Sequence, residues 1–420
     1  MSESAQSRTK GITLAIVAIA FSMYGQSICG PLIANIIMDC PEYPPTTIAM
    51  IQTWPTLGII VSSICYGALS RRLSSRMLLA IATALFLIGG IVPIFLGTNI
   101  PAILVCRAIL GLGCGVYSAM PASLIAEHYE ANTGANVQGF VQASASAGTI
   151  VMQTASGWLA TVDWRMSMWL TLICLVSLVL GFIFLPKSTH EAKGAEAAKL
   201  ESEKRAAARK SLTFSEKYPP IVIAYFVEIF LFVGGIAALM MNAAIVIGAV
   251  GGTSVESGYA LSVHTLIGFC AGLVFGIVFK RLKEYVLAVG AAIAAGAYLL
   301  IGNASDVMTI TIGAGLLGVA APWVCASFAQ LIGKYSSPLA ASMAVSISVG
   351  LQFFAQFLLA YWMPAVCNML GMDAAAGFAP FKVYAVIYIA LFVVFVIQAA
   401  TGQKKRQAAV EAVAEPMLGE

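Results

Sequence analysis

Three ionisable side chains stand alone within long apolar stretches of the sequence. Arg107 begins the run "RAILGLGCGVYSAMP", Glu228 lies in "IAYFVEIFLF", and His264 lies in "ALSVHTLIGF". An ionisable group among apolar residues is costly, so it faces a partner or a wet interior and is typically functional. A buried carboxyl group favours its protonated form, which suits a proton carrier, and histidine titrates near neutral pH. We therefore predict proton coupling for Glu228 and His264, with a structural hydrogen bond between helices as the alternative for each.

Arg107 allows three interpretations: a counter-ion for a solute, a member of a proton-coupling network, or a structural residue that bonds helix carbonyls. Uncharged polar and aromatic groups occupy the middles of other apolar stretches. They are Tyr24, Gln26, Gln142, Trp323, Gln352 and Gln356. Amides together with aromatics suit a neutral or amphipathic organic molecule better than a bare inorganic ion. No His, Cys or Asp cluster has metal-ligand spacing or the arrangement of a nucleophile and a base, so the sequence predicts no catalytic residue, metal or cofactor and no enzyme.

The elements that carry these residues are apolar segments. Of the 420 residues, 60% are hydrophobic and 10% charged, and the mean hydropathy is +0.90, which excludes a soluble globular protein. Stretches of about 20 apolar residues are long enough to cross about 30 Å of hydrocarbon as helices. The runs are continuous, whereas strands of a barrel would alternate in polarity. The sequence predicts twelve membrane helices, at 11–38, 46–70, 76–98, 100–123, 135–160, 164–186, 219–248, 256–279, 285–303, 306–331, 337–364 and 380–401.

Basic residues predict the orientation. All but three of the 23 lysines and arginines fall on one side of the twelve crossings if the N-terminus is cytoplasmic. Such an asymmetry fits the positive-inside rule, with both termini in the cytoplasm of a multi-pass protein of the cytoplasmic (inner) membrane. The net charge of +4 therefore reflects topology, and we expect no nucleic-acid partner.

The chain divides into two halves that resemble each other. A hydrophilic segment, 187–218, separates an N-terminal six-helix bundle (1–186) from a C-terminal six-helix bundle with a short cytoplasmic tail (219–420). "GALSRRL" from Gly67 and "GIVFKRL" from Gly276 occupy equivalent positions, and in each an arginine (Arg72 or Arg281) follows the glycine by five residues. Weak internal symmetry is typical of transporters built from structural repeats, with the binding site between the repeats.

Three motifs carry a resemblance to the major facilitator superfamily. "GALSRRLSSR" resembles the signature of its loop between helices 2 and 3 through Gly67, Arg72 and Arg76, although Arg71 and Ser74 replace the family's acidic residue and second glycine. "RAILGLGCG" resembles the fourth-helix signature, and "GWLATVDWRMSMW" is similar to the segment that enters helix 6. The resemblance implies twelve helices in two pseudo-symmetric bundles and transport by alternating access.

The resemblance also implies roles for particular residues. Arg107 would belong to the proton-coupling group, and the tyrosine, glutamines and tryptophan named above would contact the solute in a central cavity. The two equivalent loops would gate the conformational change, through Gly67, Arg72, Arg76, Gly276 and Arg281. We thus expect a monomeric secondary transporter in the lipid bilayer that moves a small organic solute, coupled to protons.

Two alternatives stay open. Gly139 and Gly148 have the spacing of the antiporter signature of multidrug exporters, but its Gly-Pro pair falls on Met152 and Gln153. A membrane-embedded sensor requires a soluble output domain, which the short tails do not supply. The nine cysteines are expected to pack within helices, except that Cys40 and Cys367 would both lie outside and a disulfide between them is conceivable.

Overall fold

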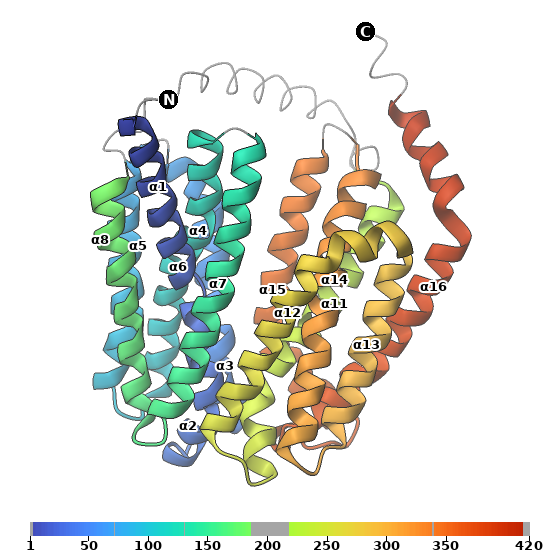
Figure 1. Ribbon diagram of the computed structural model, residues 1–420. Helices are drawn as coiled ribbons and strands as arrows, with labels where there is room; N and C mark the ends of the chain where they lie inside the picture. Colours follow the sequence, from blue (N-terminus) through green and yellow to red (C-terminus); the bar gives the residue numbers. More distant parts are fainter. Residues whose placement is uncertain (1–2, 71, 130, 186–217, 338–339, 415–420) are drawn as a thin grey trace.

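The computed structural model describes residues 3–70, 72–129, 131–185, 218–337 and 340–414, and every regular element in these ranges is a helix (Figure 1). The first half contains α1 (Glu3–Ser22), the 3₁₀ helix η1 (Gly25–Leu32), α2 (Ile33–Asp39), α3 (Pro45–Thr53), α4 (Pro55–Leu69), α5 (Ser75–Ile91), η2 (Val92–Phe95), α6 (Ile100–His128), α7 (Ala131–Leu159), η3 (Trp164–Ile173) and α8 (Cys174–Phe184). The second half contains α11 (Pro220–Ala249), α12 (Ser254–Leu282), α13 (Tyr285–Gly302), α14 (Val307–Tyr335), α15 (Ala341–Met369), η4 (Ala374–Ala376) and α16 (Ala379–Ala414).

The predicted membrane helices are present. Eleven helical stretches of the described chain are long and apolar enough to cross a membrane. The predicted stretch 135–160 forms α7, which is 29 residues long but carries many hydroxyl and amide side chains, so its composition alone does not mark it as a span. The all-α membrane fold is confirmed.

Several predicted spans are not single α-helices. The first, 11–38, consists of α1, η1 and α2, with Pro31 inside η1. The second, 46–70, changes from α3 to α4 at Trp54 and Pro55. Proline has no backbone N–H and clashes with the preceding turn, so it interrupts or kinks a helix. These breaks leave backbone carbonyls without their usual helical partner.

The helices form two bundles that stand side by side (Figure 1). α1 to α8 make one bundle, called here the N-bundle, and α11 to α16 make the other, the C-bundle. The end at which α1 begins and α16 ends is called the termini side, and the opposite end is the far side. The predicted linker, 187–218, lies outside the described residues except for Tyr218.

The two bundles repeat each other's packing. α6 contacts α4 and α5 in the N-bundle, and α14 contacts α12 and α13 in the C-bundle. A glycine at one contact in each bundle allows the close approach: a Cβ at Gly113 would lie 2.6 Å from the Ala82 carbonyl oxygen of α5, and one at Gly313 would lie 3.0 Å from the Ala297 carbonyl oxygen of α13. The pseudo-symmetry predicted from the sequence is therefore present in the fold.

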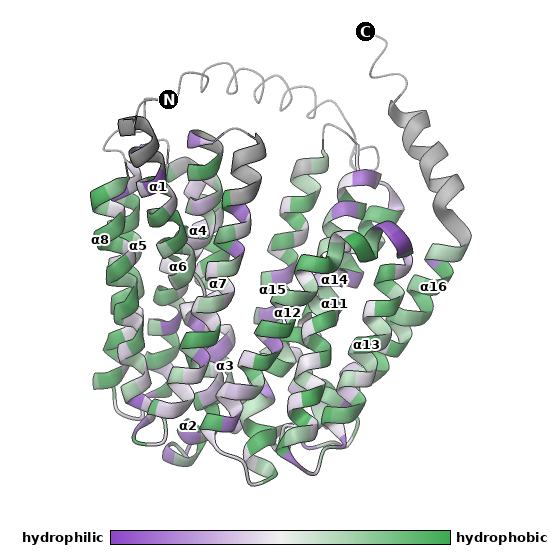
Figure 2. Cartoon of the chain, in the orientation of Figure 1, coloured by the Kyte–Doolittle hydropathy of each residue, from purple (hydrophilic) through white to green (hydrophobic). Residues whose placement is uncertain are grey.

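Hydropathy differs among the helices of the two bundles. Figure 2 shows α8 and α13 mostly hydrophobic, whereas pale and hydrophilic positions follow α7 and α3.

Cys40 and Cys367 are both buried and both free, so the conceivable disulfide is not formed.

Candidate functional site

A cavity of about 700 Å³ lies between the two bundles, near the middle of their helices. Its N-bundle wall consists of Tyr24, Gln26, Ser27, Gln52, Thr53, Thr56, Gly139, Gln142, Ser146, Thr149 and Gln153. Its C-bundle wall consists of Ile236, Ala237, Met240, His264, Thr265, Gly268, Phe269, Gly272, Leu273, Gly318, Ala321, Pro322, Cys325, Val349, Gln352, Phe353 and Gln356. None of these residues carries a permanent charge. The volume is that of sites for small organic molecules.

The structure brings five of the six predicted solute contacts into this one cavity. They are Tyr24, Gln26, Gln142, Gln352 and Gln356. They come from η1 and its N-cap, α7 and α15, which are far apart in the sequence. The sixth residue, Trp323, lies in α14 outside the lining, and its indole N–H donates to the Ala271 carbonyl of α12 at 2.9 Å. Trp323 therefore joins two helices of the C-bundle.

Arg107 binds the two interrupted helical segments of the N-bundle, η1 and α3, to α6. It is fully buried in α6 and does not line the cavity. Its Nη2 donates to the Gln26 carbonyl in η1 at 2.9 Å, and its Nε donates to the Ile51 carbonyl in α3 at 3.3 Å. The Ile51 carbonyl is the one that the N–H of residue 55 would normally bond, but that residue is Pro55.

Arg107 thus fixes two carbonyls at helix breaks, and we call this pair of hydrogen bonds the Arg107 clamp. Gln26 and its neighbour Ser27 line the cavity directly beside the clamp. The clamp matches the structural interpretation of Arg107 that the sequence left open. Its Nη1 is buried and has no hydrogen-bond partner among the described groups.

His264 is the one imidazole among the side chains of the cavity wall. It is 9% exposed, and its Nδ1 lies 3.0 Å from the Ala314 carbonyl oxygen of α14. A carbonyl oxygen only accepts, so Nδ1 carries the proton and Nε2 is the nitrogen that can exchange one. The neighbouring Thr265 hydroxyl donates to Gln153 Oε1 at 3.3 Å across the two bundles.

Glu228 lies away from the cavity. It is 6% exposed within α11, and its Oε1 accepts a hydrogen bond from the Gln398 side chain of α16. The carboxyl group is therefore buried between two helices of the C-bundle, as the structural alternative for this residue predicts. The structure also buries a second acidic group that the sequence analysis did not single out. Glu284, between α12 and α13, accepts a hydrogen bond from the Tyr335 hydroxyl.

The far side of the cavity is closed by α7 and α12. Among the described residues, all hydrogen bonds between the two bundles join the far-side halves of these helices. They include Thr154 with Ser262 at 2.8 Å and Ser254 with the Gly157 carbonyl at 3.0 Å. A Cβ at Gly157 would lie only 2.5 Å from the Ser254 carbonyl oxygen, so the close approach requires glycine there. We call this set of contacts the far-side seam.

The loops predicted to gate the conformational change lie on the termini side. Arg76 Nε donates to the Leu185 carbonyl at 2.7 Å, which ties the start of α5 to the end of α8. Arg72 is exposed in the turn before α5, and Arg281 is exposed in the last turn of α12. A Cβ at Gly67 or at Gly276 would meet no heavy atom within 4 Å, so packing does not require glycine at either position. Their predicted gating role stays a prediction.

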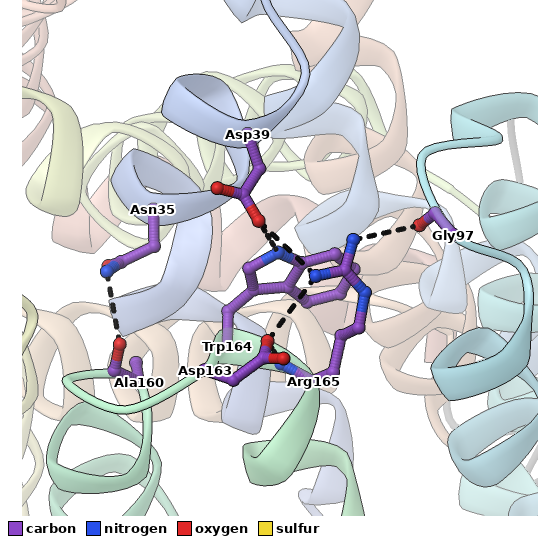
Figure 3. A network of polar contacts seen from close by, with 7 residues as sticks. All are labelled: Asn35, Asp39, Gly97, Ala160, Asp163, Trp164 and Arg165. Carbon is purple, nitrogen blue, oxygen red and sulfur yellow. Dashed lines mark hydrogen bonds and ion pairs between the residues drawn. The ribbon is translucent and has the colours of Figure 1, made fainter.

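A polar network fixes the far-side end of the N-bundle (Figure 3). Asp39, at the end of α2, accepts hydrogen bonds from Trp164 Nε1 at 2.9 Å and from Arg165 Nη1 at 3.3 Å. The Arg165 guanidinium also stacks over the Trp164 ring at 4.4 Å and contacts Asp163 and the Gly97 carbonyl. All these groups belong to the N-bundle, so the network links its far-side loops to one another.

The cavity also contains residues that the sequence analysis did not assign to the site. Gln52 and Gln153 are amides inside predicted spans, which is the signal that identified the other glutamines. Ser27, Thr53 and Thr56 had no comparable signal, because hydroxyl groups are common in membrane helices. Within the described chain, no group of three or more His, Cys, Asp or Glu side chains is placed to hold a metal ion.

Comparisons with known proteins agree with this architecture. The family model of the Major Facilitator Superfamily matches residues 15–358. No curated protein sequence matches. The nucleoside transporter NupG superposes with a TM-score of 0.70 at 13% identity, over 93% of this chain and 100% of that chain. An inward-open structure of the xylose transporter XylE from E. coli superposes with a TM-score of 0.71 at 16% identity, over 96% and 99%. A D-xylose-proton symporter gives 0.71 at 16% identity, over 91% and 97%.

Proposed function

Because this chain belongs to the major facilitator superfamily, whose model matches most of its length, we propose that it is a secondary transporter that moves a small uncharged organic solute across the cytoplasmic membrane by alternating access. One observation carries the proposal. A cavity of about 700 Å³ with a polar N-bundle wall lies between two pseudo-symmetric bundles, and the hydrogen bonds of the far-side seam join the bundles at one end of it. Rocking of the two bundles about this cavity would open the seam and expose the same side chains to the other side.

We infer the orientation from the basic residues, because the positive-inside rule predicts that the termini side lies in the cytoplasm. In that orientation the far-side seam closes the route to the outside, so the conformation corresponds to an inward-facing state. The likeness in fold to an inward-open structure of a xylose transporter supports this interpretation. Solutes named for the structural neighbours, a nucleoside and a pentose, are likewise small uncharged molecules rich in hydrogen-bonding groups.

Proton coupling is part of the proposal, and it concerns three residues. His264 reaches the cavity wall and has one ring nitrogen available for proton exchange. Glu228 is buried outside the cavity, where Gln398 can bond either its protonated or its ionised form. Arg107 would act at a distance, because its charge is fixed and its hydrogen bonds go to backbone carbonyls.

The test of transport is flux in proteoliposomes. Purified protein is first screened by thermal shift against sugars, nucleosides and other metabolites, since a ligand that binds only the folded state raises the melting temperature. Each hit is then measured by counterflow. We expect Gln142→Ala and Gln352→Ala each to reduce this flux at least tenfold. Gln138→Ala is the control, because Gln138 lies one turn before Gln142 on α7 but does not line the cavity. Hits without any flux would refute the transport function.

Coupling is tested separately with a pH gradient and no solute gradient. Uphill uptake that survives in Glu228→Gln but is lost in His264→Asn would assign coupling to the cavity wall, and the reverse result would assign it to the α11–α16 contact. The exporter alternative predicts that cells with the protein accumulate less of a cationic dye than cells without it. Nothing in the uncharged lining favours a cation, so we expect equal accumulation.

A further inference from the structure

The two walls of the cavity differ in chemistry, and this difference restricts the class of solute. Of the eleven lining residues from the N-bundle, all but Gly139 carry a hydroxyl or an amide group. Of the seventeen from the C-bundle, only His264, Thr265, Gln352 and Gln356 carry a comparable polar group. The N-bundle therefore presents a polar wall and the C-bundle a mainly apolar one.

The position of the polar exceptions sharpens this contrast. His264 and Thr265 belong to α12, which packs against α7 of the N-bundle, and the two glutamines belong to α15, which packs against α3 and α4. The helices between them, α11 and α14, line the cavity with glycine, alanine, proline, cysteine, isoleucine and methionine only. The centre of the C-bundle wall is thus apolar, and aromatic side chains of Phe269 and Phe353 stand on its flanking helices.

The polar wall contains acceptors that no described group satisfies. Gln26, Ser27 and Gln52 line the cavity, and the Oε1 atoms of the two glutamines and the hydroxyl of Ser27 are buried and make no hydrogen bond to another group in the described ranges. Ser27 as a whole is 7% exposed. Leaving a buried acceptor unsatisfied is costly, so these atoms suit a solute that donates hydrogen bonds from hydroxyl or N–H groups.

We propose, building on the transport function above, that the cavity selects uncharged solutes with two unlike sides: a donor-rich polar edge that binds Gln26, Ser27 and Gln52, and a flat apolar or aromatic face that packs against the C-bundle wall. A plain sugar satisfies the polar wall but leaves the apolar wall in contact with water. An apolar molecule leaves the acceptors unsatisfied. A charged molecule finds no opposite charge in the lining, and burying an unpaired charge is costly.

The test measures binding to the purified full-length protein in detergent, so it does not depend on flux. Matched probes are methyl β-D-glucoside, phenyl β-D-glucoside and phenyl β-D-glucuronide, with deoxyribose, thymidine and thymidine monophosphate as a second set. In each set the first compound has only the polar edge, the second has both sides, and the third adds a negative charge. We expect the second compound of at least one set to bind ten or more times tighter than both others in that set. If the second compound of neither set binds ten or more times tighter than both others, or if no probe binds, the proposal is overturned.

Variants then assign the two sides of the solute. Phe353→Ala should weaken binding of the two-sided probe about tenfold and leave its polar relative unchanged, because it removes part of the apolar wall. Phe354→Ala is the control, since that neighbouring ring does not line the cavity and packs near Phe230. Gln52→Leu should weaken both probes by a similar factor. If Phe353→Ala weakens the polar probe equally, the assignment of the face is wrong. Binding as expected without flux in proteoliposomes would refute transport but not this solute class.

Discussion

The Arg107 clamp predicts an energetic coupling between Arg107 and Pro55, which lies 52 residues earlier in the chain. Because Pro55 lacks an N–H, the Ile51 carbonyl depends on the Arg107 guanidinium for its hydrogen bond. Arg107→Lys keeps the positive charge but has a single nitrogen, which cannot reach two carbonyls on different segments as the forked guanidinium does. The substitution therefore separates the geometry of the clamp from its charge.

The magnitude follows from the two hydrogen bonds. A hydrogen bond to a charged group contributes roughly 1.5–3 kcal/mol, and a buried carbonyl left without a donor costs about 1–3 kcal/mol. Arg107→Lys should thus lower stability by about 2 kcal/mol and the melting temperature by about 2 °C for a chain of this length. Adding Pro55→Ala supplies the missing N–H at the right position in the helix. We expect it to restore about 1 kcal/mol in the Arg107→Lys background, so that the double variant is more stable than the sum of the single variants predicts.

Melting followed by tryptophan fluorescence in detergent measures all four members of this double-mutant cycle. Arg165→Lys combined with Pro55→Ala is the matched control, because Arg165 lies in the far-side network of the N-bundle and contacts neither carbonyl. That pair should be additive. The reasoning fails if Arg107→Lys and Pro55→Ala are also additive within about 0.5 kcal/mol. It also fails if Arg107→Lys melts like the parent and changes only the pH dependence of uptake.

Three further predictions concern other parts of the molecule. Gly157→Ala should push α7 away from α12 and shift the population toward molecules open on the far side by roughly fivefold, equivalent to about 1 kcal/mol. Distances between spin labels placed across the seam measure this shift. Gly296→Ala is the control and should leave these distances unchanged, because a Cβ there would meet no heavy atom within 4 Å. Asp306 caps α14, and hydrogen bonds from the Thr309 backbone and hydroxyl lower the pKa of this carboxyl group below its usual value. The stabilising effect of the ionised Asp306 is therefore fully present above the unfolded-state pKa of about 3.9, and it is lost as the pH falls through the lower folded-state value. The difference in melting temperature between Asp306→Ala and the parent should thus be constant from pH 8 to pH 5 and shrink below pH 4. Glu228→Gln keeps an oxygen that can accept the hydrogen bond from Gln398 of α16, so this variant should melt within about 1 °C of the parent. Glu228→Leu removes the acceptor and should melt at a lower temperature. Equal melting temperatures of the two variants would contradict the contact seen in the fold.

Much of the fold was predictable because membrane helices can be recognised in a sequence by their length and apolar composition. The weakest of the predicted spans by composition, 135–160, is also one that lines the cavity and forms one side of the seam. Gln142, Ser146, Thr149 and Gln153 line the cavity and Thr154 bonds Ser262 across the seam, so several of the side chains that make α7 polar serve the site. The breaks at η1 and at Pro55 were not predicted, since apolar composition does not report how backbone groups are bonded.

The candidate site was only partly predictable. Glutamines in the middles of spans were informative because a membrane helix has few reasons to contain an amide, and Gln26, Gln142, Gln352 and Gln356 all reach the cavity. Trp323 and Glu228 did not, because sequence reveals the depth of a residue but not the side of the helix on which it lies. Trp323 directly follows Pro322, which lines the cavity, and one step along a helix turns a side chain by about 100°.

The uncharged lining of the cavity has a consequence for the energetics of uptake. A membrane potential of 100 mV performs about 2.3 kcal/mol of work on each elementary charge that crosses. An uncharged solute held by amides and hydroxyls carries no charge of its own through the membrane, so the potential can act on its accumulation only through protons that cross with it. Any current recorded during transport would therefore count the protons that travel with the solute, one charge for each.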